Sequence, residues 1–133
     1  MNGLYLDNAA TSFPKAPGVA EAVAGFLINS GVNINRGLYT ASFAAANIVY
    51  ETRELLCSLF NLPKPENVIF TKNITESLNV ILKGLLKPGD HVLVSSMEHN
   101  AVMRPLASLA EKGVEVSAVL CNNQGELCPS DLG

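Results

Sequence analysis

The sequence predicts an α/β fold in which a mainly parallel sheet is flanked by helices. Two short runs, at residues 68–70 and 92–94, have the continuous apolar character of strands that are buried on both faces, and residues 114–120 are expected to form a third strand. Stretches with helical spacing of apolar residues lie between them, over residues 75–86 and 100–112. Because strands alternate with helices here, right-handed crossovers and a parallel sheet covered by helices are expected.

The N-terminal part of the chain is predicted to be irregular and then helical. Glycine, proline and short polar residues interrupt residues 1–16. A helix is expected from Pro17 to about Ile28, with proline at the first position, where a missing N–H costs nothing. A second helix is expected over residues 43–60, where apolar side chains recur at helical spacing. The expected organisation is therefore one domain, with an irregular arm at 1–16, a helical part at 17–60 and a βαβαβ part at 66–133.

The composition is that of a globular chain with a core. Of the 133 residues, 48% are hydrophobic and 16% are charged, which suits a single domain and argues against a disordered one. The net charge of −3 comes without a basic stripe, so nucleic acid is not an expected partner, and no apolar run is long enough to cross a membrane. The three cysteines match no zinc-ligand spacing, no metal site is expected, and a reducing cytoplasm fits best.

The loop after the first predicted strand is a candidate anion site. Ligands of open parallel sheets bind at the carboxyl ends of the strands, and free N–H groups at the start of a helix attract a phosphate-sized anion. Asn73, Ile74 and Thr75 occupy this position, and the Thr75 hydroxyl adds a donor. The alternative is that Asn73 and Glu76 form a capping box that binds nothing. Taken alone, the pattern favours the capping box.

The loop after the second predicted strand contains His99, which is expected at the same edge of the sheet as Thr75. An imidazole there is suited to stack on a flat ring or to transfer a proton near neutral pH. The alternative is a histidine that makes a local hydrogen bond at a helix start, and His99 by itself favours that alternative. His91 precedes the second strand, at the opposite edge, and is expected to be structural.

Several motifs together resemble the N-terminal part of cysteine desulfurases, in the class V aminotransferase group. They follow one another in the family's order from about Tyr5 to the end of the chain. The motifs are Tyr5–Ser12, Asn35–Gly37, Val68–Thr71, Asn73–Asn79, Lys87–Val92 and Glu98–Asn100.

The resemblance implies a pyridoxal 5'-phosphate enzyme of fold type I, usually a homodimer, in which this chain forms the N-terminal portion of the large domain. Ile74 and Thr75, in the loop that begins at Asn73, match the positions that hold the cofactor phosphate. His99 matches a histidine that stacks on the pyridine ring and takes part in catalysis. A segment near the substrate entrance is matched by Asn8, Ala9, Ala10 and Arg36.

The family reaction removes sulfur from L-cysteine, leaves L-alanine and transfers the sulfur to an enzyme cysteine as a persulfide. The family's cofactor-binding lysine follows a histidine on a later strand, and no lysine of this chain has that context. The 133-residue chain alone is therefore expected to be inactive. Two alternatives stay open: another class V enzyme, such as a selenocysteine lyase or an aminotransferase, and a non-catalytic α/β binding module.

Overall fold

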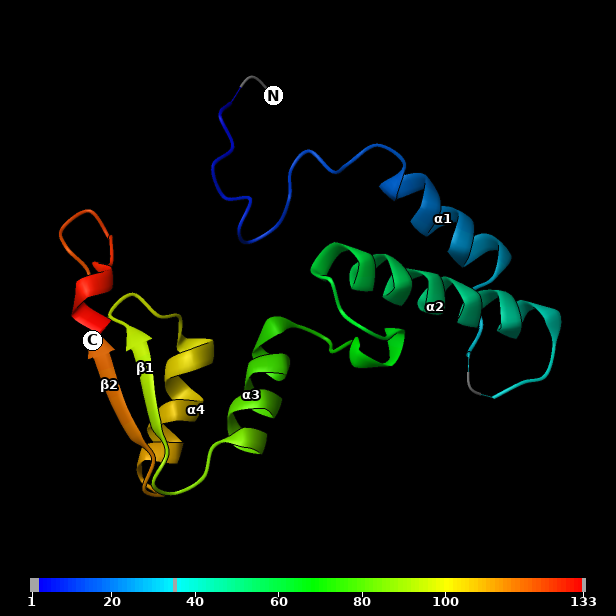
Figure 1. The fold of residues 1–133 in the computed structure, drawn as a ribbon. Helices are drawn as coiled ribbons and strands as arrows, with labels where there is room; N and C mark the ends of the chain where they lie inside the picture. The colour runs from blue at the N-terminus through cyan, green and yellow to red at the C-terminus, as the bar shows by residue number, and fades with distance from the viewer. Residues whose placement is uncertain (1–2, 35, 133) are drawn as a thin grey trace. The chain divides into compact units, whose positions relative to one another are not determined.

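The structure is a computed structural model that describes residues 3–34 and 36–132 (Figure 1). The chain divides into two compact units, residues 1–69 and residues 70–133. Each unit is described by itself below.

The first unit is helical. It contains α1 (Val19–Asn29), α2 (Thr40–Phe60) and the short 3-10 helix η1 (Pro65–Asn67). Helix α2 begins three residues before the expected start at residue 43, and it ends where expected. Asn61 adopts a left-handed conformation with φ of 52°, and the N–H of Leu62 donates to the Cys57 carbonyl at 2.9 Å, which ends the helix.

The start of α1 differs from the expectation that proline would occupy its first position. The helix begins at Val19, because Gly18 has φ of +85° and therefore cannot be part of a right-handed helix. Pro17 lies before this glycine, outside the helix. A glycine directly after the proline is the local signal for the later start.

The second unit contains helix and strand in alternation. Its elements are α3 (Ile74–Leu85), β1 (His91–Ser95), α4 (Asn100–Ala110), β2 (Glu115–Val119) and the short 3-10 helix η2 (Pro129–Leu132). The two strands are parallel, with His91 paired to Glu115 and Ser95 to Val119 (Figure 1). The predicted parallel pairing of these two strands is confirmed, and the two predicted helices α3 and α4 form within two residues of their expected ends.

The core of the second unit lies between one face of the sheet and the helices. Val94 from β1 and Val114 before β2 are buried against Leu106 and Leu109 of α4. Leu82 of α3 packs against the same cluster. Leu106 is the centre of this packing, since only 1% of its surface is exposed.

The predicted strand at residues 68–70 is wrong. Val68 has extended torsion angles, but Ile69 and Phe70 expose 73% and 49% of their surface, and the sheet of the described residues joins β1 and β2 only. An apolar run forms a strand only where a neighbouring backbone supplies ladder hydrogen bonds. Burial on both faces is also wrong for β1, because Leu93 is 50% exposed while Val94 beside it is buried.

Tight turns join these elements. Gly113 ends the α4 segment with φ of +94°, which confirms the predicted left-handed residue at this place. Gly89, with φ of +93°, turns the chain into β1, and its N–H donates to the Gly113 carbonyl at 2.8 Å.

Among the residues described, no helix combines the length and the apolar character needed to cross a bilayer.

Candidate functional site

The starts of α3 and α4 lie at one end of the second unit. Both helices run in the direction opposite to the strands, so they begin at the end where β1 and β2 finish (Figure 1). The two helices pack against each other. Thr75, in the first turn of α3, and His99, directly before α4, therefore lie at the same rim of this unit.

The first turn of α3 is capped by its own side chains. The Oδ1 atom of Asn73 accepts the N–H of Glu76 at 2.9 Å, as a capping box requires. The Glu76 carboxylate reaches back one residue further than usual, and its Oε2 accepts the N–H of Lys72 at 2.8 Å. The local cap that the sequence offered as an alternative is thus present.

The cap does not use every donor of this turn. Within the described residues, the N–H groups of Ile74 and Thr75 and the Thr75 hydroxyl make no hydrogen bond. Thr75 is exposed to solvent. Three donors beside the positive end of the α3 dipole make a set suited to a phosphate group, and they remain available while Asn73 caps the helix.

His99 caps α4 with its ring. Its Nδ1 atom accepts the N–H of Ala101 at 3.0 Å, so this nitrogen carries no proton and the neutral ring is protonated at Nε2. The residue as a whole is exposed. The hydrogen bond restrains the imidazole and leaves Nε2 available, an arrangement that serves equally for a local cap and for a ring held beside a ligand.

Ser96, which the sequence did not single out, links the His99 loop to β2. Its N–H donates to the Val119 carbonyl at 2.9 Å, and its Oγ accepts the N–H of Cys121 at 2.9 Å. A serine in a polar loop carries no pattern that predicts these two partners, because they lie in β2 and in the segment directly after it, far along the sequence.

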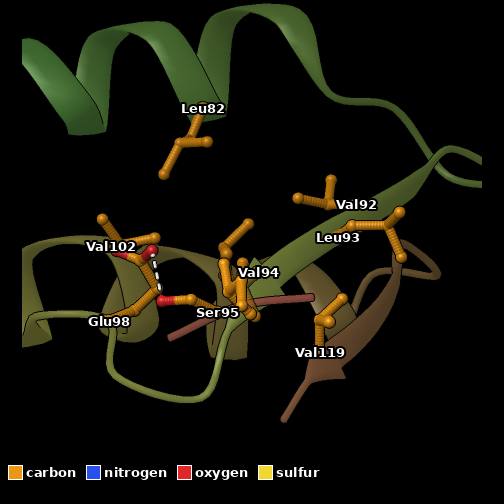
Figure 2. Close-up of a pocket in the computed structure, with 10 residues that line it drawn as sticks. Leu82, Val92, Leu93, Val94, Ser95, Glu98, Val102 and Val119 are labelled. Carbon is orange, nitrogen blue, oxygen red and sulfur yellow. Dashed lines mark hydrogen bonds between the residues drawn. The ribbon is translucent and has the colours of Figure 1, made fainter. Parts of the chain in front are cut away.

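A separate apolar cavity of about 410 Å³ opens beside β1 and α4 (Figure 2). Leu82, Val94 and Val102 are among its lining residues. Its polar edge is the Ser95 hydroxyl, which donates to Oε1 of Glu98 at 2.9 Å. Neither Thr75 nor His99 lines this cavity. A carboxylate in an apolar wall repels a phosphate, so we place the candidate anion site at the start of α3 instead.

The predicted entrance segment Asn8–Ala10 forms a turn in the arm of the first unit. Oδ1 of Asn8 accepts the N–H of Phe13 at 3.1 Å, and the N–H of Ala10 donates to the Asp7 carbonyl at 3.2 Å. The Tyr5 hydroxyl donates to the Thr11 carbonyl at 2.8 Å. The Asn8 amide oxygen is thus used within the arm, where its hydrogen bond gives Asn8 a structural role.

Arg36, the last predicted entrance residue, also belongs to the first unit. It is exposed and lines a hollow of about 520 Å³ together with Ser42 and Phe43. Asn35, its neighbour in the motif, lies outside the described residues.

Across residues 3–34 and 36–132, no group of three or more His, Cys, Asp or Glu side chains is arranged to hold a metal ion.

A comparison with known families identifies the family of the chain. The profile of the class V aminotransferase family matches residues 4–133. The chain belongs to this family. A probable cysteine desulfurase of Methanothermobacter thermautotrophicus is 32% identical over 130 residues, which are 97% of this chain and 32% of the relative. This chain therefore spans about a third of the length of the cysteine desulfurases that it matches.

Solved structures share the fold of this class V segment. The apo structure of a cysteine desulfurase from Thermococcus onnurineus NA1 is 31% identical and superposes with a TM-score of 0.82, over 96% of this chain and 32% of the other. A C-DES mutant with glycine covalently linked to its PLP cofactor has a TM-score of 0.54 at 21% identity, over 76% of this chain and 26% of the other. At that identity the second likeness shows a common fold alone.

Proposed function

We propose that this chain supplies the phosphate-binding side of the cofactor site in a cysteine desulfurase that uses pyridoxal 5'-phosphate. The observation that carries the proposal is the donor set at the start of α3. Ile74 and Thr75 offer two N–H groups and one hydroxyl that no other described group uses, beside the positive end of a helix. The names of the relatives support the choice of reaction and substrate, and membership of the class V aminotransferase family supports the choice of cofactor.

The residues present fit a phosphate monoester. Three donors on two consecutive residues of one helical turn suit a small dianion. Asn73 keeps that turn in place by accepting the N–H of Glu76. His99 caps the neighbouring helix α4, and the N–H of Ala101 restrains its ring. When bound, pyridoxal phosphate supplies an electron sink for bond cleavage at the substrate amino acid. In this proposal Ile74 and Thr75 bind the phosphate, and His99 positions the ring.

The proposed reaction of the whole protein removes sulfur from L-cysteine, releases L-alanine and leaves the sulfur on a cysteine of the enzyme as a persulfide. We propose that the protein acts as a cytoplasmic homodimer. The 133-residue chain on its own is expected to show no turnover, because none of its lysines follows a histidine. Release of alanine from L-cysteine by the purified chain would contradict this part of the proposal.

The test of the pocket is a titration with inorganic phosphate and with pyridoxal phosphate, followed by NMR of the backbone amides. We expect the amide signals of Ile74 and Thr75 to shift. Thr75→Ala should weaken phosphate binding roughly ten- to a hundredfold, because a hydrogen bond to a charged group contributes about 1.5–3 kcal/mol. Thr75→Ser keeps the hydroxyl and should bind like the parent chain.

A stability measurement separates this role from a structural one. The Thr75 hydroxyl makes no hydrogen bond within the described residues and alanine is the better helix former, so Thr75→Ala should unfold at the same or a slightly higher urea concentration than the parent. Asn73→Ala, in contrast, removes the cap and should cost about 1 kcal/mol of stability. The proposal fails if neither ligand shifts the two amides, or if Thr75→Ala binds phosphate as well as the parent does.

A further inference from the structure

The segment that follows β2 folds back on itself around one asparagine. The N–H of Asn122 donates to the Glu126 carbonyl at 3.0 Å, and its Oδ1 accepts the N–H groups of Gln124 and Glu126 at 2.8 and 3.0 Å. The side-chain amide of Asn122 also donates to Oε2 of Glu126 at 2.9 Å. These bonds reverse the chain direction between residues 122 and 126 and hold Asn122 against Glu126.

Two cysteines flank this turn and line one hollow. Cys121 and Cys128 both contribute to a cavity of about 480 Å³, together with Asn122, Glu126 and Leu127 between them. Cys128 is exposed and Cys121 is partly exposed, so reagents in solution reach both thiols. The third cysteine, Cys57, is buried in α2 of the first unit and provides an internal reference.

The two thiols are chemically different. The Sγ atom of Cys128 lies 2.9 Å from the Ser130 hydroxyl. Hydrogen bonds from the side chain and then the backbone of Ser130 lower the pKa of the Cys128 thiol below its ordinary value. A thiolate is the nucleophilic form of cysteine, so the hydrogen bonds from Ser130 favour attack by Cys128.

The position of Cys121 is fixed by the loop that contains His99. Its N–H donates to the Ser96 hydroxyl at 2.9 Å. At the tip of the turn, a Cβ on Gly125 would lie 3.1 Å from the sulfur of Met97, so the turn packs closely on that loop. The thiol of Cys121 is therefore attached to an anchored backbone and lines the same hollow as Cys128.

We propose that Cys121 and Cys128 form a dithiol modification site that exchanges with low-molecular-weight disulfides. The Cys128 thiolate attacks one sulfur of the reagent disulfide, forms a mixed disulfide and expels one thiolate. Cys121, after losing its proton to solvent, attacks Sγ of Cys128 and expels the second thiolate, which closes a Cys121–Cys128 disulfide. The reagent disulfide is reduced to two thiols as the protein dithiol is oxidised. This site does not depend on the proposed cofactor function.

The test uses the 133-residue chain and oxidised glutathione, followed by mass spectrometry of the intact protein and of its peptides. The expected product has lost two hydrogens, retains no glutathione and contains a peptide pair joined through Cys121 and Cys128, while Cys57 stays reduced. Glutathione that remains bound to Cys128 in the parent chain would overturn the proposal, as would a disulfide that involves Cys57.

Matched variants assign the order of the two steps. Cys121→Ser should stop after the first step and keep one glutathione on Cys128. Cys128→Ser should react several-fold more slowly, at Cys121 alone, because the more acidic thiol is gone. Ser130→Ala should move the pH profile of Cys128 modification to higher pH, since the hydrogen bonds that favour the thiolate are reduced. Equal rates for Cys128→Ser and Cys121→Ser, or an unchanged profile in Ser130→Ala, would contradict the assigned roles.

Discussion

The cap that His99 makes for α4 gives a stability change that is testable without any ligand. In the structure, Nδ1 of His99 accepts the N–H of Ala101 at 3.0 Å, and His99→Ala removes this acceptor. The side chain is exposed, so little apolar burial is lost with it. Replacing a capping side chain by alanine costs about 0.5–2 kcal/mol, and a loss of about 1 kcal/mol lowers the ratio of folded to unfolded chain about fivefold.

Urea unfolding followed by circular dichroism measures this loss, and amide hydrogen exchange at Ala101 locates it. His99→Asn restores a side-chain acceptor at the same position and should be as stable as the parent, since asparagine caps helices well. The chain offers a control in its other histidine, because His91→Ala removes only the pair between Nε2 and the Ser117 hydroxyl. Equal stability of His99→Ala and the parent, or equal losses in the alanine and asparagine variants, would refute the capping argument.

Two further changes test the packing of the second unit. Leu106→Ala should lower the free energy of unfolding by about 2–5 kcal/mol in urea titrations, because Leu106 is 1% exposed at the centre of the core; a smaller loss would mean that the cavity collapses. Gly113→Ala should destabilise the chain by about 1–2 kcal/mol, because Gly113 has φ of +94°. Gly84→Ala should stabilise the chain slightly, because Gly84 lies in a helix with open space around it. Thermal unfolding of the two variants tests this contrast.

The elements of the second unit were predictable because local rules and packing agree there. Helices were predicted over residues 75–86 and 100–112, and in the structure α4 buries Leu106 and Leu109 while Leu82 of α3 packs against the same cluster. Asn73 before the first helix and Gly113 after the second are the residues that capping rules require. Where sequence pattern and packing point the same way, the sequence alone was sufficient.

The failures have a common physical cause. A strand at residues 68–70 and burial of both faces of β1 both require neighbouring backbone or side chains, which no local pattern encodes. Extended torsion angles at Val68 follow from its β-branched side chain, but ladder hydrogen bonds do not. In the candidate site, too, only the local feature was predictable. The cap at Asn73 follows from local spacing, whereas the hydrogen bond between Ser96 and Cys121 depends on tertiary structure.

The choice of threonine at position 75 is the strongest link between the local structure and a ligand. A β-branched residue is a poorer helix former than alanine, and Thr75 lies exposed in the first turn of α3. Its hydroxyl gains no hydrogen bond from the described residues in return, whereas the neighbouring Asn73 and Glu76 both cap the helix. Stability therefore explains Asn73 and Glu76 but not Thr75. We propose that a bound anion accounts for Thr75, because the hydroxyl and the two adjacent N–H groups would then gain the acceptor that the described residues do not supply.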